Sequence, residues 1–131
     1  MYNIKGEDNI FYVNGENPKG NRSGLVDILT SSDRPTAVFA YADFLAKQVI
    51  DAAKEQGLRV PEDLAVIGYF NTPWVDMLEV PLTFVSIKED TIAGIAAQKL
   101  QASINHPVKL PETIYVKPEL IIRKSCGVKK S

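Results

Sequence analysis

The sequence predicts an α/β fold in which a parallel β-sheet carries helices on both faces, a three-layer arrangement. Two short apolar runs, residues 36–40 and 64–68, each end in polar or turn-forming residues, and one amphipathic segment lies between them. A strand, a helix and a second strand with short connections form a right-handed crossover, which makes the two strands parallel. Such sheets bind ligands at the carboxyl ends of their strands, here residues 41–43 and 69–71, and we expect function there.

The first predicted elements precede this unit. Residues 10–13 favour a strand, which the turn-forming run N-G-E-N-P-K-G-N stops. Residues 21–31 place Leu25, Ile28 and Leu29 at helical spacing, and the following S-S-D-R-P ends that helix. The strand at 36–40 is apolar nearly throughout, which is typical of a parallel strand that is covered on both faces.

Residues 44–56 form the clearest helix of the sequence. Its apolar positions share one stripe: Leu45, Ala46, Val49, Ile50 and Ala53. Gly57 supplies a left-handed stop, and the run V-P-E-D at 60–63 forms the turn into the strand at 64–68. The second half of the crossover is therefore predicted as well as the first.

The remaining elements are shorter or lie near the end of the chain. Trp74, Met77 and Leu78 have the spacing of one or two helical turns, residues 83–87 predict a strand, and residues 91–104 predict a second long helix. Residues 114–116 and 120–122 predict extended structure. We expect a single α/β domain over residues 1–131.

The composition excludes several classes of protein. Fifteen basic and sixteen acidic residues give a net charge of −1, which argues against a dedicated nucleic-acid surface. Cys126 is the single cysteine, so no internal disulfide can form, and no Cys/His cluster offers metal-ligand spacing. The polar start does not resemble a signal peptide, and no apolar run approaches the roughly 20 residues that span a bilayer. We expect no metal, no cofactor, no membrane contact and a cytoplasmic location.

Five segments together resemble a known family: R-P-T-A-V-F-A-Y-A-D, G-L-R-V-P-E-D-L-A-V-I-G-Y, V-P-L-T-F-V, A-G-I-A-A-Q-K-L and P-E-L-I-I-R-K-S-C. Their order and spacing resemble the C-terminal part of the effector-binding region of lactose-repressor/galactose-repressor transcription regulators, over about residues 20–126. The resemblance implies a Rossmann-like lobe of a periplasmic-binding-protein-like fold. In that family two such lobes close on a small molecule, often a sugar or a nucleotide base, and an N-terminal domain binds DNA.

The resemblance assigns these 131 residues to the second lobe, without a counterpart of the first lobe or of the DNA-binding domain. Contact with DNA is then expected only through such an N-terminal domain. In relatives, the segment that corresponds to residues 84–104 packs on the first lobe. Its apolar stripe, Ile92, Ile95 and Leu100, needs cover, so we expect it either to repack within this chain or to exchange with a second copy.

The candidate ligand-binding residues are Tyr41, Asp43, Phe70, Asn71 and Glu16. The first four follow the two predicted parallel strands, whereas Glu16 lies in the loop where the resemblance implies a ligand-contacting aromatic residue. Relatives commonly carry Asn at Ala42 and often Asp at Phe70. Both departures remove hydrogen-bonding groups that a polyol needs in a dry cleft.

Each candidate also has a structural alternative. Phe70 offers a stacking face to a sugar or a planar base, or it packs against a neighbour. Asn71 presents an amide to a ligand or forms an Asx turn. For Asp43, capping of the helix at 44–56 is favoured over ligand contact.

A subunit interface is implied by the same resemblance. Leu45, Trp74, Met77 and Leu78 correspond to parts of relatives that form a homodimer, and aromatic and Met residues are enriched at the centres of interfaces. Packing in the core of the chain is an equally good interpretation for each of them.

The leading interpretation is a non-catalytic, ligand-sensing and dimerising part of a transcription regulator. Its partner would be a small-molecule effector, most readily a sugar, and a single lobe is expected to bind it weakly or not at all. The alternative is a lobe of a periplasmic-type sugar-binding protein. An enzyme is disfavoured because the motifs G-x-S-x-G, P-loop and G-x-G-x-x-G are absent.

Overall fold

The computed structural model describes residues 10–12, 18–70, 72–105 and 112–127. Their strands form one four-stranded sheet in the order β1 (Ala37–Phe39), β2 (Ala65–Tyr69), β3 (Thr83–Ser86) and β4 (Glu119–Ile121). β1 pairs with β2, and β2 with β3, in parallel, whereas β4 is antiparallel to β3. The predicted parallel pair and the α/β class are confirmed.

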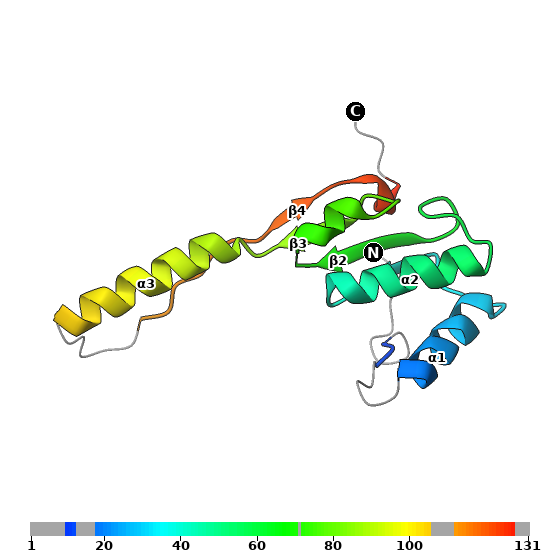
Figure 1. Ribbon diagram of the computed structural model, residues 1–131, viewed down its shortest axis with the longest axis horizontal. Helices are drawn as coiled ribbons and strands as arrows, with labels where there is room; N and C mark the ends of the chain where they lie inside the picture. The colour runs from blue at the N-terminus through cyan, green and yellow to red at the C-terminus, as the bar shows by residue number, and fades with distance from the viewer. Residues whose placement is uncertain (1–9, 13–17, 71, 106–111, 128–131) are drawn as a thin grey trace, which may run out of the picture.

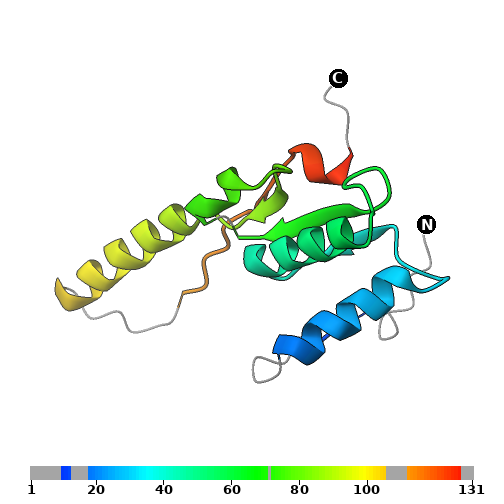
Figure 2. The ribbon, with the colours of Figure 1, turned by 45° about the vertical axis from the view of Figure 1, so that its right-hand side comes forward.

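Three α-helices and two short 3-10 helices complete the described fold: α1 (Pro18–Thr30), α2 (Asp43–Glu55), η2 (Pro73–Met77), α3 (Glu89–Asn105) and η3 (Lys124–Cys126). In Figures 1 and 2, α2 lies along the sheet and α1 lies on α2. The fully buried residues between them include Leu29 of α1, Ala46 of α2 and Val66 of β2. The apolar stripe predicted for α2 is therefore the side of the helix that faces the core.

Gly68 leaves room for the buried side chain of Leu82. A Cβ atom at this position would lie 2.8 Å from Cδ2 of Leu82, whereas its distance of 3.6 Å from Cβ of Ala46 in α2 would be an ordinary contact. Glycine therefore lets Leu82 pack against the backbone of β2 without being displaced.

The first end segment differs from the sequence prediction. Residues 10–12 are not a strand in the structure, and Val13 lies outside the described residues, while residues 114–116, predicted only as extended, pair with no described strand. Tyr115 is 91% exposed and Tyr12 is 80% exposed, so these β-favouring runs find no strand to pair with. β-propensity describes how well a residue fits a pleated, half-buried surface, and here the surface is missing.

The outer face of β1 was expected to be covered, and this prediction is wrong. β1 is an edge strand of the described sheet, Ala37 is exposed and Phe39 is 59% exposed. Only Val38 of this strand turns toward α2 and packs against the core. The aromatic side chain of Phe39 is therefore exposed at the carboxyl end of β1.

Helix α3 projects away from the sheet, as Figures 1 and 2 show. Ile92, Leu100 and Ile104 are 41%, 65% and 74% exposed, and Ile95 alone is half-buried among the residues of this helix whose burial is described. Repacking of the stripe within the chain is therefore contradicted, because Ile92 and Leu100, two of its three members, stay exposed. Exchange with a second copy stays a prediction.

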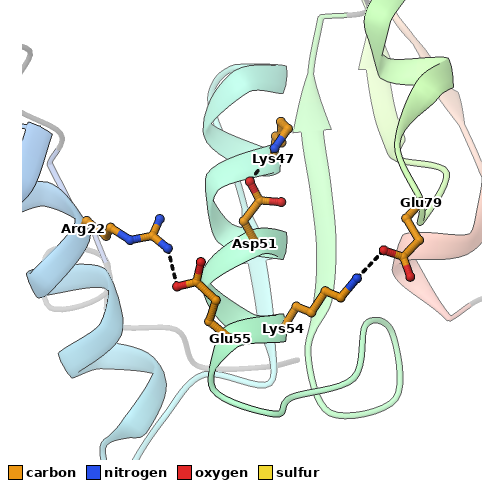
Figure 3. A network of polar contacts seen from close by, with 6 residues as sticks. All are labelled: Arg22, Lys47, Asp51, Lys54, Glu55 and Glu79. Atoms are coloured by element: carbon orange, nitrogen blue, oxygen red, sulfur yellow. Dashed lines mark hydrogen bonds and ion pairs between the residues drawn. The ribbon is translucent and has the colours of Figure 1, made fainter.

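Ion pairs bind the helices at their surfaces. Figure 3 shows three of them, one joining α1 to α2, one within α2, and one joining α2 to the segment after η2: Arg22–Glu55, Lys47–Asp51 and Lys54–Glu79. All six side chains are about half exposed or more, so water and salt screen these pairs and each contributes little to stability.

The terminal R-K-S-C run closes the amino ends of β2 and β3. The Ser125 hydroxyl is fully buried, donates to the Val66 carbonyl at 2.6 Å and accepts from the Thr83 N–H at 2.8 Å. The Thr83 hydroxyl in turn lies 3.1 Å from Sγ of Cys126 and accepts from the Arg123 N–H at 2.9 Å. One short turn thereby supplies the hydrogen bonds that two buried strand ends require.

The turn before β2 contains a bidentate ion pair. Arg59 Nε lies 2.7 Å from Oδ2 of Asp63 and Arg59 Nη2 lies 2.9 Å from Oδ1, while the Arg59 N–H also donates to Oδ2 at 2.9 Å. Hydrogen bonding to the Arg59 side chain, then to its backbone, holds the pKa of Asp63 well below its ordinary value of 3.8. The charged carboxylate thus shapes the turn of the V-P-E-D signature.

The pKa of Asp63 predicts a specific acid sensitivity. Because the folded pKa is depressed, the stabilisation is complete above the pKa of the unfolded chain and is lost as pH falls toward the folded pKa. Asp63→Asn is expected to be less stable than the wild type at neutral pH, and the two should converge in acid. Urea unfolding over a pH series measures this, with Glu62→Gln as the control carboxylate. Parallel pH curves for the wild type and Asp63→Asn would contradict it.

Candidate functional site

The carboxyl ends of β1 and β2 lie side by side, as the sequence predicted. The two strands run parallel in the register Phe39 to Ile67, and the Ala40 N–H donates to the Ile67 carbonyl at 2.8 Å. Just beyond, the rings of Tyr41 and Tyr69 stack with centroids 5.9 Å apart and an interplanar angle of 11°. Residues near 41 and 69 therefore form one surface at one edge of the sheet.

Tyr69 is the centre of a cluster of four aromatic rings. Besides Tyr41, it contacts Phe39 edge-on at 6.3 Å and Phe70 edge-on at 4.6 Å between centroids. We call Phe39, Tyr41, Tyr69 and Phe70 the aromatic cluster. Tyr41 is 72% exposed, so the cluster presents ring faces and a phenol hydroxyl to solvent, groups that can stack on a ring and hydrogen-bond its substituents.

Phe39 and Tyr69 were not named as candidate ligand residues, although Tyr69 begins the segment 69–71 in which function was expected. Residues 39 and 41 are two positions apart, so both fall on one side of the strand, and β1–β2 pairing brings Tyr69 beside them. The alternation of side chains between the two faces of each strand would have been enough to identify Phe39 and Tyr69 from the sequence.

Phe70 adopts an uncommon backbone conformation, with φ of 69° in the left-handed region. Its N–H donates to the Val85 carbonyl at 3.2 Å, which extends the β2–β3 pairing by one residue. Phe70 packs edge-on against Tyr69, as the structural alternative has it, and the residue is partly exposed. Asn71 and Glu16, the other two predicted ligand residues, lie outside the described part of the chain.

Asp43 is neither exposed to a ligand nor the N-cap of its helix. Helix α2 begins at Asp43 itself, and the N-cap is Ala42, which makes no side-chain capping bond. Asp43 is 5% exposed; its Oδ1 accepts from the Phe44 N–H at 2.7 Å and its Oδ2 accepts from the Thr72 N–H at 3.0 Å. The Thr72 hydroxyl also donates to Oδ2. The carboxylate thus joins the two strand-end loops, a role that sequence spacing did not indicate.

The four residues predicted for a dimer interface divide into two groups. Leu45 and Leu78 are partly buried and pack against the core, as the structural alternative has it. Met77 is 86% exposed at the end of η2. Trp74 lies in η2, but its side chain is outside what the structure describes. Met77 is therefore the member of the set that is seen to be open to a partner.

Other features of the described residues do not coincide with the predicted site. A hollow of about 350 Å³ lies along α1, lined by Lys19, Arg22, Ser23, Val26 and Asp27, and includes none of the predicted site residues. Within the described ranges, no three His, Cys, Asp or Glu side chains converge as metal ligands. None of the described helices is both long and apolar enough to cross a membrane.

The fold and its strand-end site define a lobe of the periplasmic binding protein-like class, and the sequence model of that domain matches residues 6–126. The ribose operon repressor of Haemophilus influenzae is 32% identical over 107 residues, which are 82% of this chain and 32% of that repressor. The transcriptional repressor PurR of Mannheimia succiniciproducens is 41% identical over 98 residues, 75% of this chain and 29% of that protein. The chain belongs to the lactose-repressor/galactose-repressor family, which confirms the resemblance seen in the sequence.

Solved structures give the same result. A LacI family regulator from Enterococcus faecium, solved with bound ribose, superposes with a TM-score of 0.72 at 27% identity, over 83% of this chain and 40% of the other. A LacI family regulatory protein from Chloroflexus aggregans gives 0.72 at 32% identity, over 81% and 38%. This chain spans about a third of the length of the curated relatives it matches.

Proposed function

We propose that these residues form the second lobe of the ligand-sensing region of a bacterial transcription regulator that acts in the cytoplasm and catalyses no reaction. The observation that carries the proposal is the side-by-side placement of the β1 and β2 ends, with Tyr41 stacked on Tyr69. Ligands of parallel α/β sheets bind at this edge. Relatives named as ribose operon repressor and PurR support the regulatory role.

The proposed ligand is a small ring molecule, most readily a sugar. Aromatic faces stack on the apolar face of a pyranose or furanose ring, while hydroxyls need polar partners nearby. The aromatic cluster supplies the first, and the related regulator from Enterococcus faecium was solved with ribose. Phe70, which stands where relatives often carry Asp, favours a ligand with fewer polar contacts on this side.

One lobe alone contacts a ligand from one side only, so we expect the 131-residue chain to bind D-ribose weakly or not at all. In the protein encoded by the whole reading frame that contains this lobe, Tyr41→Ala is expected to weaken ribose binding about tenfold, because about one aromatic contact is lost. Calorimetric titration measures both, with Tyr115→Ala as the control because Tyr115 is 91% exposed and outside the cluster. Micromolar affinity of the 131 residues alone, or equal losses in the two variants, would contradict the proposal.

A second candidate is a lobe of a periplasmic-type sugar-binding protein, since residues 6–126 match the periplasmic binding protein-like domain. The coding sequence immediately upstream separates the two. A DNA-binding domain there supports the regulator, in which DNA is contacted only through that domain. A secretion signal or lipid-anchor cysteine would support the alternative.

We further propose a homodimer in which Met77 and the start of α2 contact a second copy. Met77 and Phe44 are 86% and 54% exposed, and exposed Met and aromatic residues are enriched at interface centres. Met77→Asp is expected to shift the chain toward monomer in sedimentation equilibrium. Ile104→Asp, at the far end of α3, tests the competing exchange of that helix. An unchanged mass for Met77→Asp with dissociation by Ile104→Asp would assign the contact to α3.

A further inference from the structure

We propose that Asp43 is a positioning residue whose carboxylate ties the β1–α2 connection to the β2–η2 connection and thereby fixes the geometry of the aromatic cluster. Its contact with Thr72 is called the Asp43–Thr72 clasp. The clasp itself is independent of ligand identity, whereas its consequence for binding rests on the proposed sensing function.

Both oxygens of the carboxylate accept hydrogen bonds from the chain itself. Oδ1 accepts the Phe44 N–H at 2.7 Å, and Oδ2 accepts both the N–H, at 3.0 Å, and the hydroxyl of Thr72. The side chain is 5% exposed and begins α2, where the helix dipole favours a negative charge. A carboxylate that is buried and engaged at both oxygens orients its neighbours and has little left to offer a ligand.

The clasp lies two residues beyond Phe70, the residue with φ of 69°. On the preceding side, the Phe70 N–H is held by the Val85 carbonyl at 3.2 Å. On the following side, Thr72 is held by Asp43 and is the N-cap of η2, whose Val75 N–H donates to the Thr72 carbonyl at 3.1 Å. A left-handed conformation is unfavourable for phenylalanine and persists where the surrounding structure fixes both ends.

The direction of the Phe70 ring follows from this backbone. With Phe70 left-handed, its ring meets Tyr69 edge-on at 4.6 Å, while Tyr69 stacks on Tyr41, which lies two residues before Asp43. The clasp therefore connects the two backbone segments that carry three of the four clustered rings. Breaking it frees both segments at once, although no ring itself is changed.

The experiment compares four variants of the 131-residue chain well below their melting temperatures. Asp43→Asn keeps the size of the side chain but replaces one accepting oxygen with a donor, and Thr72→Val removes the donating hydroxyl. Thr72→Ser retains that hydroxyl and serves as the rescue. Asp51→Asn is the control for loss of a carboxylate from α2, because Asp51 pairs with Lys47 on the surface.

The readouts are proton NOEs between the Tyr69 and Phe70 rings and the tyrosine band of the near-UV circular dichroism spectrum. Asp43→Asn and Thr72→Val should lose the ring NOEs and most of the tyrosine band, with Thr72→Ser and Asp51→Asn like the wild type. A role confined to stability would lower the melting temperature and leave both signals intact in the folded chain. That result for Asp43→Asn overturns the proposal; if Asp43→Asn does not fold, intact signals in Thr72→Val overturn it.

Ligand binding separates this inference from the proposed function. Suppose that the ring signals change as expected while the protein encoded by the whole reading frame binds neither D-ribose nor a nucleobase such as adenine. In that case the sensing role fails and the clasp stands. If the wild type binds and Asp43→Asn binds equally tightly with altered ring signals, positioning of the cluster is not what determines affinity, and the functional part of the inference is overturned.

Discussion

Ser125→Ala is expected to lower the free energy of unfolding by about 2–4 kcal/mol, because a buried polar group that loses its partner costs about 1–3 kcal/mol. The hydroxyl is 0% exposed and serves two strands, accepting from the Thr83 N–H at 2.8 Å and donating to the Val66 carbonyl at 2.6 Å. Its removal deprives both backbone groups of this contact, and water does not reach them in the closed amino end of the sheet.

Urea unfolding of Ser125→Ala measures the loss. Ser103→Ala is the matched control, since the Ser103 hydroxyl bonds to the Lys99 carbonyl at 2.9 Å on the exposed surface of α3. The same substitution there should change stability by less than about 0.5 kcal/mol, as surface changes usually do. Similar losses for the two serines would show that the buried hydroxyl is not the origin of the effect.

Leu64→Ala should destabilise the chain by about 2–5 kcal/mol, the usual range for a large-to-small change in a core. Leu64 is 0% exposed and belongs to the core cluster that also contains Leu29, Val49 and Val75. These members of the cluster come from α1, α2 and η2, so the core can close the resulting cavity only by moving whole elements.

Thermal and urea unfolding of Leu64→Ala provide the measurement. Leu120→Ala in β4 removes the same atoms from a side chain that is 51% exposed and is expected to cost a small fraction of that amount. A loss for Leu120→Ala equal to that for Leu64→Ala would contradict the position of the core.

Local signals were enough to predict most of the central fold. The predicted helix at 44–56 is α2 within one residue at each end, and the predicted strands at 36–40 and 64–68 contain β1 and most of β2. The short crossover also predicted their parallel pairing, which places Tyr41 beside Tyr69. These features depend on periodicity and connection length, which are properties of neighbouring residues.

Features that depend on distant contacts were missed. Asp43 finds its partner at Thr72, 29 residues away, so sequence spacing suggested a cap instead. The left-handed Phe70 was not predicted, because nothing in its local sequence requires that conformation. Coverage of a strand face also depends on elements elsewhere, and so apolar Phe39 was wrongly placed in the interior.

The exposed position of α3 has a consequence for its own folding. A helix that packs on little else is held mainly by its local hydrogen bonds; isolated helices shorter than about 12–15 residues are marginal in water, and α3, with 17 residues, is only slightly longer. After its first turn this helix carries one charged side chain, Lys99, so few surface ion pairs support it. Its amide protons should therefore exchange with deuterium far faster than those of α2. Any molecule that binds over α3 would slow this exchange, so the exchange rate of α3 measures its association with a partner.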